Sequence, residues 1–486
     1  MLDREDWLPI ARKLDWEYSY VREEEVFPEA VSGAPWLAHD AWRDWDEPFR
    51  TSYREYVDNQ HAKDADLYAV REAVGRVEGF QRQPAAWLNG IKLHAATLPL
   101  AEFAAVVGEL RGARFGRNSA WRAMATLGAL DELRHTHIPL VVMHDLVRHE
   151  PQFDWTHRFF YTEDWVAVAA RHLVDELLLG SSAIDFALGT NFVFETGFTN
   201  LQFVGLAAIA HKVGDHIFEK MVKSIQTDEA RHAQIGVSTL RVIAARDPER
   251  AQYLIDKWFW RTWLFFAVVT GFTMDYLTPL DRRAHSFKEF TEEWIVDQYL
   301  RSLADLGMKK PWYWELFLDA LETYHHMVYA SAYTYRHTVW FDFVIPGPEE
   351  RAWLRRKYPS SWDALEPVWE RIAEGWRSAT PGDERAAHGE AMVGFCSLCQ
   401  LVLCQGTPGR NAAVTLEHDG RRYVFCSEPC RWIFQQEPER YASHRGIDDR
   451  VLEGAAPADL EGLLDYFGLT PETRGRDAFG GDYPWL

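Results

Sequence analysis

The stretch LDELRHTHIPL, at residues 130–140, decides the fold, because a near copy, TDEARHAQIG, occurs at residues 227–236. Both carry the order Asp-Glu-x-Arg-His. In a helix, the glutamate and the histidine of each copy are three residues apart and therefore share one face. A single copy would be typical of a charged surface helix held by Asp–Arg pairs. The repetition instead raises the question of a metal site made of two halves.

Each copy follows another glutamate that lies in an apolar helix. Glu102 occurs in LPLAEFAAVVGEL (98–110), and Glu195 occurs in NFVFETGF (191–198). A buried, unpaired carboxylate costs several kcal/mol or else takes up a proton, so these positions indicate a partner such as an ion. For either glutamate alone, a protonated or snorkelling side chain on an ordinary helix remains an alternative.

Taken together, the pattern is an internal duplication of Glu followed by Glu-x-x-His. Its members are Glu102, Glu132 with His135, Glu195, and Glu229 with His232. Four helices that project this set are typical of carboxylate-bridged di-iron or di-manganese bundles. Four carboxylates and two hydroxides would neutralise two ferric ions, with neutral imidazoles as the nitrogen ligands.

The residues beside these ligands suggest a supporting layer. Asp131 and Asp228 are expected to accept the free imidazole N–H groups of the ligand histidines and so to fix their tautomers. Arg134 and Arg231 would balance the charges of these aspartates. For the two arginines, an exposed salt-bridge network is an equally good interpretation.

The composition limits the class of protein. The 486 residues include 47% hydrophobic residues and 22 Trp, enough for a wide core. A formal charge of −21 argues against nucleic-acid binding. We expect no membrane insertion, since stretches such as Trp263–Phe272 are shorter than the ~20 residues of a span, and no signal peptide. All five cysteines lie between Cys396 and Cys430, which fits a reducing, cytoplasmic location.

Apolar periodicity predicts an all-α bundle with additional helices and a small C-terminal α+β cysteine module, and the ligand pattern makes this a ferritin-like di-iron bundle. We expect an irregular, wrapping N-terminal segment over residues 1–90, the di-iron helical bundle over 91–380 and the cysteine module with a tail over 381–486. The predicted helices are Leu98–Arg114, Asn118–Val147, Asp164–Gly180, Ser182–His211, Gly214–Ala245 and Arg250–Met274, with further helix over Ser286–Tyr335.

Six longer stretches carry a resemblance to a known family. They are DEPFRTSYREYV (46–57), MATLGALDELRH (124–135), FETGFTNLQFVGLAA (194–208), SIQTDEARHAQ (224–234), SFKEF (286–290) and KPWYWELFLDAL (310–321). In these the chain resembles the alpha subunit of bacterial multicomponent di-iron hydroxylases, in particular the toluene/o-xylene monooxygenase group, over nearly its whole length.

The resemblance implies roles for individual residues. Glu102, Glu132 and His135 would bind one iron, and Glu195, Glu229 and His232 the other, with a carboxylate bridging. Glu229 and Thr199, one turn beyond Glu195, would act in catalysis; the alternative for Thr199 is a hydroxyl bonded back to its own helix. Asn200 and Gln226 would respond to an effector protein. The implied substrate pocket, for which ordinary core packing is the alternative, is lined by Leu98, Ala101, Ala105, Val174, Phe194 and Phe203.

Two positions depart from the pattern of members that oxidise arenes. Leu173-Val174 stands where a Phe-Phe pair is common, and Thr190 stands where an aliphatic residue is usual. These differences leave open whether the substrate is an arene or an alkene, because one methylene discriminates by only ~1–3 kcal/mol.

The implied activity is hydroxylation of aromatic hydrocarbons or epoxidation of alkenes with dioxygen at a di-iron centre. The chain has no flavin or nicotinamide fingerprint, so its electrons must come from other proteins. The resemblance implies an NADH reductase, a Rieske ferredoxin, a small effector protein, and beta and gamma subunits in an α2β2γ2 assembly.

The C-terminal cysteines form a separate pattern. Cys396 and Cys399 in CSLC and Cys426 and Cys430 in FCSEPC flank TLEHDGRRYVFC, which is typical of a hairpin with Asp419-Gly420 at its turn. Four thiolates in this order indicate a structural zinc site, with reduced thiols and no metal as the alternative. Cys404 would be spare. The second half of the module resembles small domains with a Tyr-His-Ser signature.

Other classes of protein use related ligands. A soluble acyl-carrier desaturase has similar Glu-x-x-Arg-His pairs, although FETGFTN and the cysteine module speak against it. A radical-generating ribonucleotide reductase subunit would need a tyrosine beside the cluster, and the ligand segments contain none. A non-catalytic helical protein that binds or stores iron is the alternative from outside the enzymes.

Overall fold

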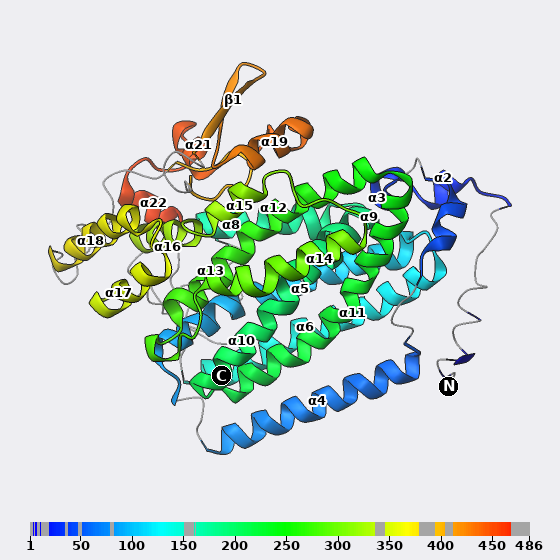
Figure 1. The fold of residues 1–486 in the computed structure, drawn as a ribbon, viewed down its shortest axis with the longest axis horizontal. Coiled ribbons are helices and arrows are strands. Elements are labelled where there is room, and N and C mark those ends of the chain that lie inside the picture. The colour runs from blue at the N-terminus through cyan, green and yellow to red at the C-terminus, as the bar shows by residue number, and fades with distance from the viewer. Residues whose placement is uncertain are drawn as a thin grey trace.

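The computed structural model describes residues 3, 5, 6, 10 and 19–467, except 35–36, 47–50, 78–81, 150–159, 161, 336–345, 379–393 and 404–411. The described chain is mostly helical, and long helices lie side by side in a bundle with a hairpin module above them (Figure 1). The predicted fold class is therefore confirmed.

Four long helical segments form the centre of the bundle. They are α5 (Ala85–Phe115), α6 (Ser119–Val147), the run of α9 (Ala183–Phe186), η5 (Ala187–Thr199) and α10 (Asn200–Val213), and α11 (His216–Arg246). The side chain of Asn118 accepts a hydrogen bond from the Ala120 amide at the start of α6, and Asp215 caps α11 in the same way. α5 packs along α6, and η5 packs along α11. These segments confirm the predicted helices, although α5 begins earlier than expected, so that the proposed border at residue 90 falls inside it.

Two π-helical stretches belong to this centre or pack against it, which a 3.6-residue period does not predict. They are η4 (Val174–Leu179) and η5, which carries Glu195. Wide turns of this kind occur often at functional sites. Gly236 on α11 permits the close approach of η5, because a Cβ there would lie 2.3 Å from the backbone nitrogen of Phe192.

The N-terminal segment is not irregular throughout, which corrects the expectation for residues 1–90. After α2 (Glu23–Val26), α3 (Glu29–Ser32) and η1 (His39–Asp44), residues 53–76 form the long helix α4 (Tyr53–Arg76). Ser52 and Glu55 close a capping box at its start. Only three of its side chains are buried, so the apolar pattern was too weak to predict the helix. α4 lies at the edge of the bundle and runs alongside α11 (Figure 1).

Further helices cover the other side of the bundle. They are α8 (Trp165–Leu173), η4, α12 (Pro248–Phe272), η6 (Thr273–Leu277), η7 (Leu280–Arg282), α13 (Phe287–Phe290), η8 (Thr291–Val296), α14 (Asp297–Asp305), α15 (Trp314–Ala320), α16 (Tyr324–Tyr335), α17 (Pro348–Lys357) and α18 (Trp362–Ser378). α12 is largely buried, and its Trp258, Trp260 and Trp263 are almost completely enclosed. Several of the many tryptophans of the sequence thus pack in this layer.

The C-terminal module contains the predicted hairpin. β1 (Val414–His418) pairs antiparallel with β2 (Arg421–Phe425), and Asp419 and Gly420 both have positive φ in the turn. α19 (Glu428–Gln436), α20 (Pro438–Tyr441), α21 (Ile447–Leu452) and α22 (Leu460–Tyr466) follow. Glu437 joins the module to α12, because it accepts hydrogen bonds from Tyr253 and Lys257. The proposed domain border near residue 380 and Cys404 lie outside the described residues.

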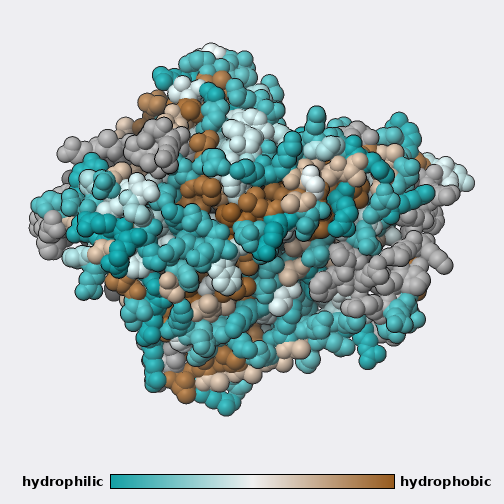
Figure 2. Space-filling view, in the orientation of Figure 1, coloured by the Kyte–Doolittle hydropathy of each residue, from teal (hydrophilic) through white to brown (hydrophobic). Residues whose placement is uncertain are grey.

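Two helical segments are long and apolar enough to cross a membrane by length and composition alone, Ala85–Phe115 and Ala183–Val213, and a bent pair passes the same test jointly. In both segments 61% of the most apolar window is buried inside the protein, and each carries a glutamate into the centre of the bundle. On the face in Figure 2, hydrophilic residues cover most of the surface and hydrophobic ones form separate patches. Packing inside the bundle therefore accounts for this apolar composition.

Candidate metal centre

The structure brings all six predicted iron ligands together in the interior. Glu102 comes from α5, Glu132 and His135 from α6, Glu195 from η5, and Glu229 and His232 from α11. Each of these residues is at most 9% exposed. The Glu-x-x-His spacing places both side chains of each pair on the inward face of its helix. A Glu and a Glu-x-x-His motif thus enter from each half of the bundle.

The histidine nitrogens Nδ1 point into the cluster of carboxylates. Nδ1 of His135 lies 3.3 Å from Oε2 of Glu132, 3.2 Å from Oε1 of Glu229 and 3.8 Å from Oε2 of Glu102. These four residues offer ligand atoms that all lie within 4.8 Å of one another. They are one candidate metal position.

A second position lies around the other histidine. Nδ1 of His232 lies 3.1 Å from Oε1 of Glu132, 3.9 Å from Oε2 of Glu229 and 3.9 Å from Oε1 of Glu195. Glu132 and Glu229 therefore belong to both groups, and each turns one oxygen toward either histidine. This is the geometry of two bridging carboxylates, with Glu102 and Glu195 at opposite ends.

The electrostatics of the cluster fit a pair of cations. Oε2 of Glu132 and Nδ1 of both histidines are buried, and none of them has a hydrogen-bond partner among the described residues. Burial, together with repulsion from Glu102 and Glu229, raises the pKa of Glu132 to about 8. Burial and the charge of Glu229 likewise raise the pKa of Glu195 well above its usual range. Metal cations would relieve this repulsion and occupy the unpartnered atoms.

The two aspartates are paired crosswise with the imidazoles: each aspartate contacts the histidine of the other Asp-Glu-x-Arg-His motif. Nε2 of His135 lies 3.3 Å from Oδ2 of Asp228, and Nε2 of His232 lies 3.0 Å from Oδ2 of Asp131. Each aspartate thus serves the histidine of the opposite helix, which the sequence did not predict. An Nε2–H group that donates to a carboxylate leaves Nδ1 free for a metal.

Helix α4 supplies three residues that the sequence analysis missed. Tyr56 donates to Asp131 at 2.9 Å, Gln60 donates to Asp131 at 2.6 Å and to Asp228 at 2.8 Å, and Lys63 forms an ion pair with Asp228. The stretch SYRE could have indicated the start of helix α4, because Ser52 and Glu55 form a capping box there.

The two arginines complete this layer. Arg231 is 4% exposed and pairs with Asp131 and, at 3.2 Å, with Asp228. Arg134 contacts Asp64 at 2.7 Å and Asp228 at 3.1 Å, and its side chain is 11% exposed. The alternative of an exposed network is therefore wrong for Arg231, whereas Arg134 lies at the edge of the network, since its partner Asp64 is 40% exposed.

A cavity of about 80 Å³ adjoins the four ligand glutamates. Five of the predicted pocket residues line it: Leu98, Ala101, Ala105, Phe194 and Phe203. Val174 does not, which corrects the prediction; it begins the π-helical turn η4, and Leu178 in that turn lines the cavity instead. Phe265, Phe266 and Val269 of α12 also line it and were missed. We call this space the inner cavity.

Two threonine hydroxyls border the inner cavity. Oγ1 of Thr199 and Oγ1 of Thr190 are buried, and neither has a hydrogen-bond partner among the described residues. The alternative that Thr199 bonds back to its own helix is therefore wrong. Asn200 and Gln226, the predicted effector-responsive pair, are hydrogen-bonded to each other at 2.5 Å. Their response to a partner stays a prediction.

A fifth buried glutamate at this centre, Glu109, was not predicted. Asn191 donates to Glu109 at 2.8 Å and to Glu195 at 3.1 Å, and so connects the two glutamates. Burial raises the pKa of Glu109 to about 7. Its position in VVGEL, seven residues or two helical turns after Glu102, was not distinguished from ordinary helix surface.

The four predicted zinc ligands also come together. The sulfurs of Cys396, Cys399, Cys426 and Cys430 lie within 4.8 Å of one another, and all four cysteines are buried and free of disulfides. Tetrahedral zinc with Zn–S bonds of about 2.3 Å needs sulfurs roughly 3.8 Å apart, and Cys426 and Cys430 are 3.4 Å apart. Nε1 of Trp260 donates to the sulfur of Cys430 at 3.1 Å, as it would to a thiolate. The donor set therefore fits zinc.

Two other clusters hold histidines. Asp275 already accepts hydrogen bonds from His325, Tyr358 and the Phe287 amide, which accounts for it as a structural group. His211 and His216 both face Glu219 at the surface, where Lys223 pairs with the same carboxylate. Neither cluster adjoins the inner cavity.

A helical bundle that presents two shared and two end carboxylates with two inward histidines defines a carboxylate-bridged dinuclear metalloprotein. Comparison with known proteins identifies the family. Residues 16–247 match the methane/phenol/alkene hydroxylase family, and residues 410–445 match the YHS domain.

Relatives cover the whole chain. It is 40% identical to the oxygenase component subunit alpha of the alkene monooxygenase system of Xanthobacter autotrophicus, over 100% of this chain and 97% of that one. It is 29% identical to the oxygenase component of phenol 2-monooxygenase from a Pseudomonas species, over 89% and 83%. The crystal structure of xenon-pressurised phenol hydroxylase from Pseudomonas sp. OX1 superposes with a TM-score of 0.83 at 26% identity, covering 100% and 98%.

The chain therefore belongs to the methane/phenol/alkene hydroxylase family, as the catalytic oxygenase subunit of a multicomponent di-iron monooxygenase. The predicted resemblances to this family and to the Tyr-His-Ser domains are confirmed.

Proposed function

We propose that this subunit inserts one oxygen atom of dioxygen into a small nonpolar substrate, with an alkene preferred to an arene, at two irons. Glu102 and His135 would hold one iron, Glu195 and His232 would hold the other, and Glu132 and Glu229 would contribute an oxygen to each. The observation that carries the proposal is the pair of glutamates whose two oxygens face different histidines.

Two irons bound there supply the redox chemistry that activates dioxygen. The protein contributes position and exclusion of water. Phe194, Phe203, Phe265 and Phe266 surround the substrate with apolar surface. The Thr199 hydroxyl, one turn beyond Glu195, is free to donate or accept a proton at Oγ1 beside the metal ligands.

The substrate class follows from the shape of the inner cavity and from the relatives. Its volume of about 80 Å³ is small for a pocket, and its wall away from the ligand glutamates is mostly apolar, with the Thr190 and Thr199 hydroxyls among its few polar groups. A relative at 40% identity is an alkene monooxygenase, and one at 29% identity is a phenol 2-monooxygenase. These observations support a small alkene as the preferred substrate and an arene as the second candidate.

Ala105→Leu is expected to lower kcat/KM for toluene about 10- to 200-fold more than kcat/KM for propene. Ala105 lines the inner cavity one turn beyond Glu102, so that a larger side chain removes room for a ring before it removes room for three carbons. Competition assays with both substrates measure the ratio. Ala208→Leu on the exposed face of α10 is the matched control and should leave the ratio unchanged. An equal loss for both substrates would contradict the assignment of Ala105 to the pocket.

The proposed function is tested with the complete system and ¹⁸O-labelled dioxygen. Propene, isoprene, toluene and phenol are supplied with NADH, and products are analysed by mass spectrometry. We expect one labelled oxygen atom in each oxidised product and the highest kcat/KM for an alkene. Formation of a new double bond without label would indicate the desaturase alternative. NADH consumption without any oxygenated product would overturn the proposal.

Partner proteins are part of the proposal. Electrons would come from NADH through a reductase and a Rieske ferredoxin, a small effector would act near Asn200 and Gln226, and the hydroxylase would be a cytoplasmic α2β2γ2 assembly. Exposed hydrophobic side chains on α5 and α6 support contact with another subunit, because Phe103, Leu110 and Leu130 are 52%, 51% and 43% exposed.

We also propose zinc at the four cysteines. Replacing all four by serine is expected to remove one zinc per chain and to leave the iron content unchanged, because the six iron ligands come from other helices. Elemental analysis of the purified hydroxylase measures both metals. Wild-type protein that contains no zinc after expression in zinc-supplemented medium would contradict the proposal.

A further inference from the structure

Two histidines and a glutamate converge where α10 ends and α11 begins. Nδ1 of His211 lies 3.1 Å from Oε2 of Glu219, and Nδ1 of His216 lies 3.2 Å from the same oxygen. The three residues offer ligand atoms that all lie within 4.8 Å of one another. Tetrahedral zinc with bonds of about 2.0–2.1 Å needs nitrogen and oxygen donors roughly 3.3 Å apart. The two measured distances therefore fit ligands of one shared ion.

The turn between the two helices fixes the position of His211. Gly214 ends α10 with a φ of 87°, and its amide donates to the carbonyl of His211 at 3.2 Å. The Asp215 amide donates to the carbonyl of Ala210 at 2.9 Å. These two bonds form the tight closure that a left-handed glycine permits at the end of a helix. The last turn of α10 is thus held directly beside the first turn of α11.

The other two ligands lie on a helix start that is also fixed. Asp215 accepts from the Phe218 amide at 2.9 Å and from Nε1 of the buried Trp87 at 2.9 Å, and so anchors the beginning of α11 in the bundle. His216 and Glu219 are three residues apart on α11 and share one face. All three ligands are therefore brought together by the backbone.

The cluster is open to solvent on the side of its histidines. The side chains of His211 and His216 are 67% and 54% exposed, whereas that of Glu219 is 11% exposed. Lys223 pairs with Oε1 of Glu219 and leaves Oε2 to the two imidazoles. Two histidines and one glutamate, with water in the fourth position, are an established ligand set for zinc. An ion from solution can reach this site without passage through the bundle.

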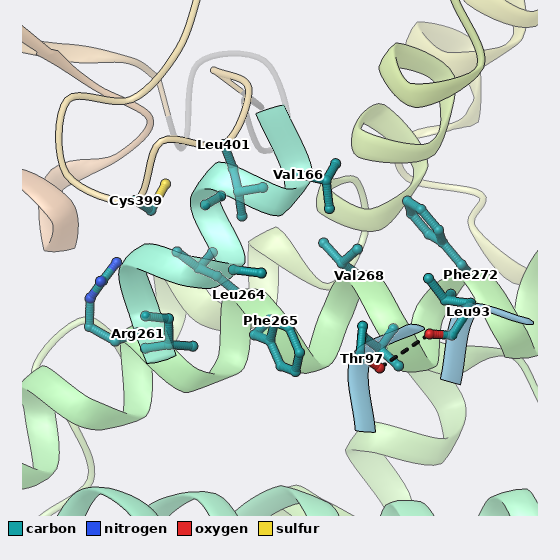
Figure 3. A pocket seen from close by; sticks show the side chains of 14 residues that line it. Leu93, Thr97, Val166, Arg261, Leu264, Phe265, Val268, Phe272, Cys399 and Leu401 are labelled. Atoms are coloured by element: carbon teal, nitrogen blue, oxygen red, sulfur yellow. Dashed lines mark hydrogen bonds between the residues drawn. The ribbon is translucent and has the colours of Figure 1, made fainter. Parts of the chain in front are cut away.

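The cluster is separate from the other two candidate metal sites. Glu219 precedes the iron ligand Glu229 by ten residues on α11, which corresponds to about 15 Å along the helix. The cysteine module lies against α8 and α12, and Figure 3 shows its Cys399 and Leu401 at a pocket that Val166 and Leu264 also line. A metal at the end of α10 is therefore too distant from the irons to take part in their chemistry.

We infer that His211, His216 and Glu219 form a further metal site, which takes a divalent transition-metal ion such as zinc and so joins the end of α10 to the first turn of α11. The inference goes beyond the proposed function, and it rests neither on the substrate nor on the zinc at the cysteines. The ion would restrain the two helices that also carry Asn200 and Gln226, the predicted effector-responsive pair.

Zinc binding to the complete, iron-loaded hydroxylase is the first test, with a chelating indicator that reports free zinc. We expect the wild type to bind one zinc per chain that His211→Ala and His216→Ala bind at least about tenfold more weakly, since even the partners of metal ligands contribute a factor of this size. His285→Ala removes another exposed histidine that faces a glutamate, Glu293 at 4.0 Å, and is the matched control. Its zinc affinity should equal that of the wild type.

Two further variants separate a metal site from a cluster of ion pairs. Glu219→Gln should weaken zinc binding, because it removes the negative charge of a ligand. Lys223→Ala should bind zinc at least as tightly as the wild type, because it removes a positive charge and no ligand. The iron content of every variant should stay at the wild-type value, which shows that the bundle is folded. The variant with four serines in the cysteine module should keep the zinc at His211 and His216.

The place of the ion is tested in crystals of the complete hydroxylase soaked in zinc chloride. Anomalous data at the zinc edge should give a peak bonded to Nδ1 of His211, Nδ1 of His216 and Oε2 of Glu219, and none there in His211→Ala. Zinc should also slow amide hydrogen exchange over residues 211–219 in the wild type only. A map without this peak, or equal zinc affinity in the wild type and both histidine variants, would overturn the inference. Unchanged exchange would overturn the joining of the two helices. Absence of oxygenated product would overturn the proposed function alone.

Discussion

Glu132→Ala is expected to remove both irons and to lower kcat/KM on the order of 10³-fold or more. Oε1 of Glu132 faces His232 and Oε2 faces His135, so one substitution takes a ligand from both metal positions. Glu102→Ala removes a ligand from one position only, because Glu102 lies near His135 and not near His232. We expect the Glu102 variant to keep about one iron per chain.

The measurement is the iron content of purified hydroxylase, together with its Mössbauer spectrum. Glu249→Ala is a suitable control, since Glu249 is an exposed residue at the start of α12 and distant in sequence from every ligand. Its iron content and activity should equal those of the wild type. Equal iron loss in Glu132→Ala and Glu102→Ala would show that Glu132 does not bridge.

Asp228→Asn is expected to lower iron affinity and kcat/KM by about 10- to 100-fold. Asp228 accepts from Nε2 of His135 and receives Lys63, Arg134 and Gln60 as further partners. Its burial would raise its pKa, but the hydrogen bond of His135 and the nearby cations outweigh this effect and hold the pKa far below its usual range. An uncharged amide accepts more weakly and cannot pair with the charges of Lys63 and Arg134, so the imidazole is held less firmly.

The crosswise arrangement gives this prediction a specific signature. Although Asp228 is adjacent to Glu229 in the chain, its substitution should disturb the iron at His135 more than the iron at His232. Asp131→Asn should do the reverse, because Asp131 serves His232. Titration of apoprotein with Fe²⁺ separates the two sites. Asp58→Asn, at an exposed aspartate of α4, is the control and should change neither site.

The duplicated motif was sufficient to predict which side chains meet, since a Glu-x-x-His spacing and a helical period determine a common face. It could not predict which oxygens are shared. That property depends on how η5 and α11 approach each other, and the approach depends on the π-helical turns and on Gly236. The crosswise pairing of Asp131 and Asp228 is likewise a result of packing between helices that are distant in sequence.

The contribution of α4 was missed for a different reason. Its polar residues Tyr56, Gln60 and Lys63 face the centre of the protein, where they bind the two aspartates, so the usual rule that buried helix faces are apolar fails for this helix. Val174 was placed in the pocket by the resemblance to the family, and the π-helical turn η4 brings Leu178 there instead.

The central claim is that two irons share Glu132 and Glu229. Its most direct test is a crystal structure of the iron-loaded hydroxylase with anomalous data collected at the iron edge. We predict two iron peaks, one bonded to Nδ1 of His135 and one to Nδ1 of His232, with a carboxylate oxygen of Glu132 and of Glu229 on each. A single peak, or two peaks without a carboxylate from Glu132 and Glu229 between them, would contradict the account.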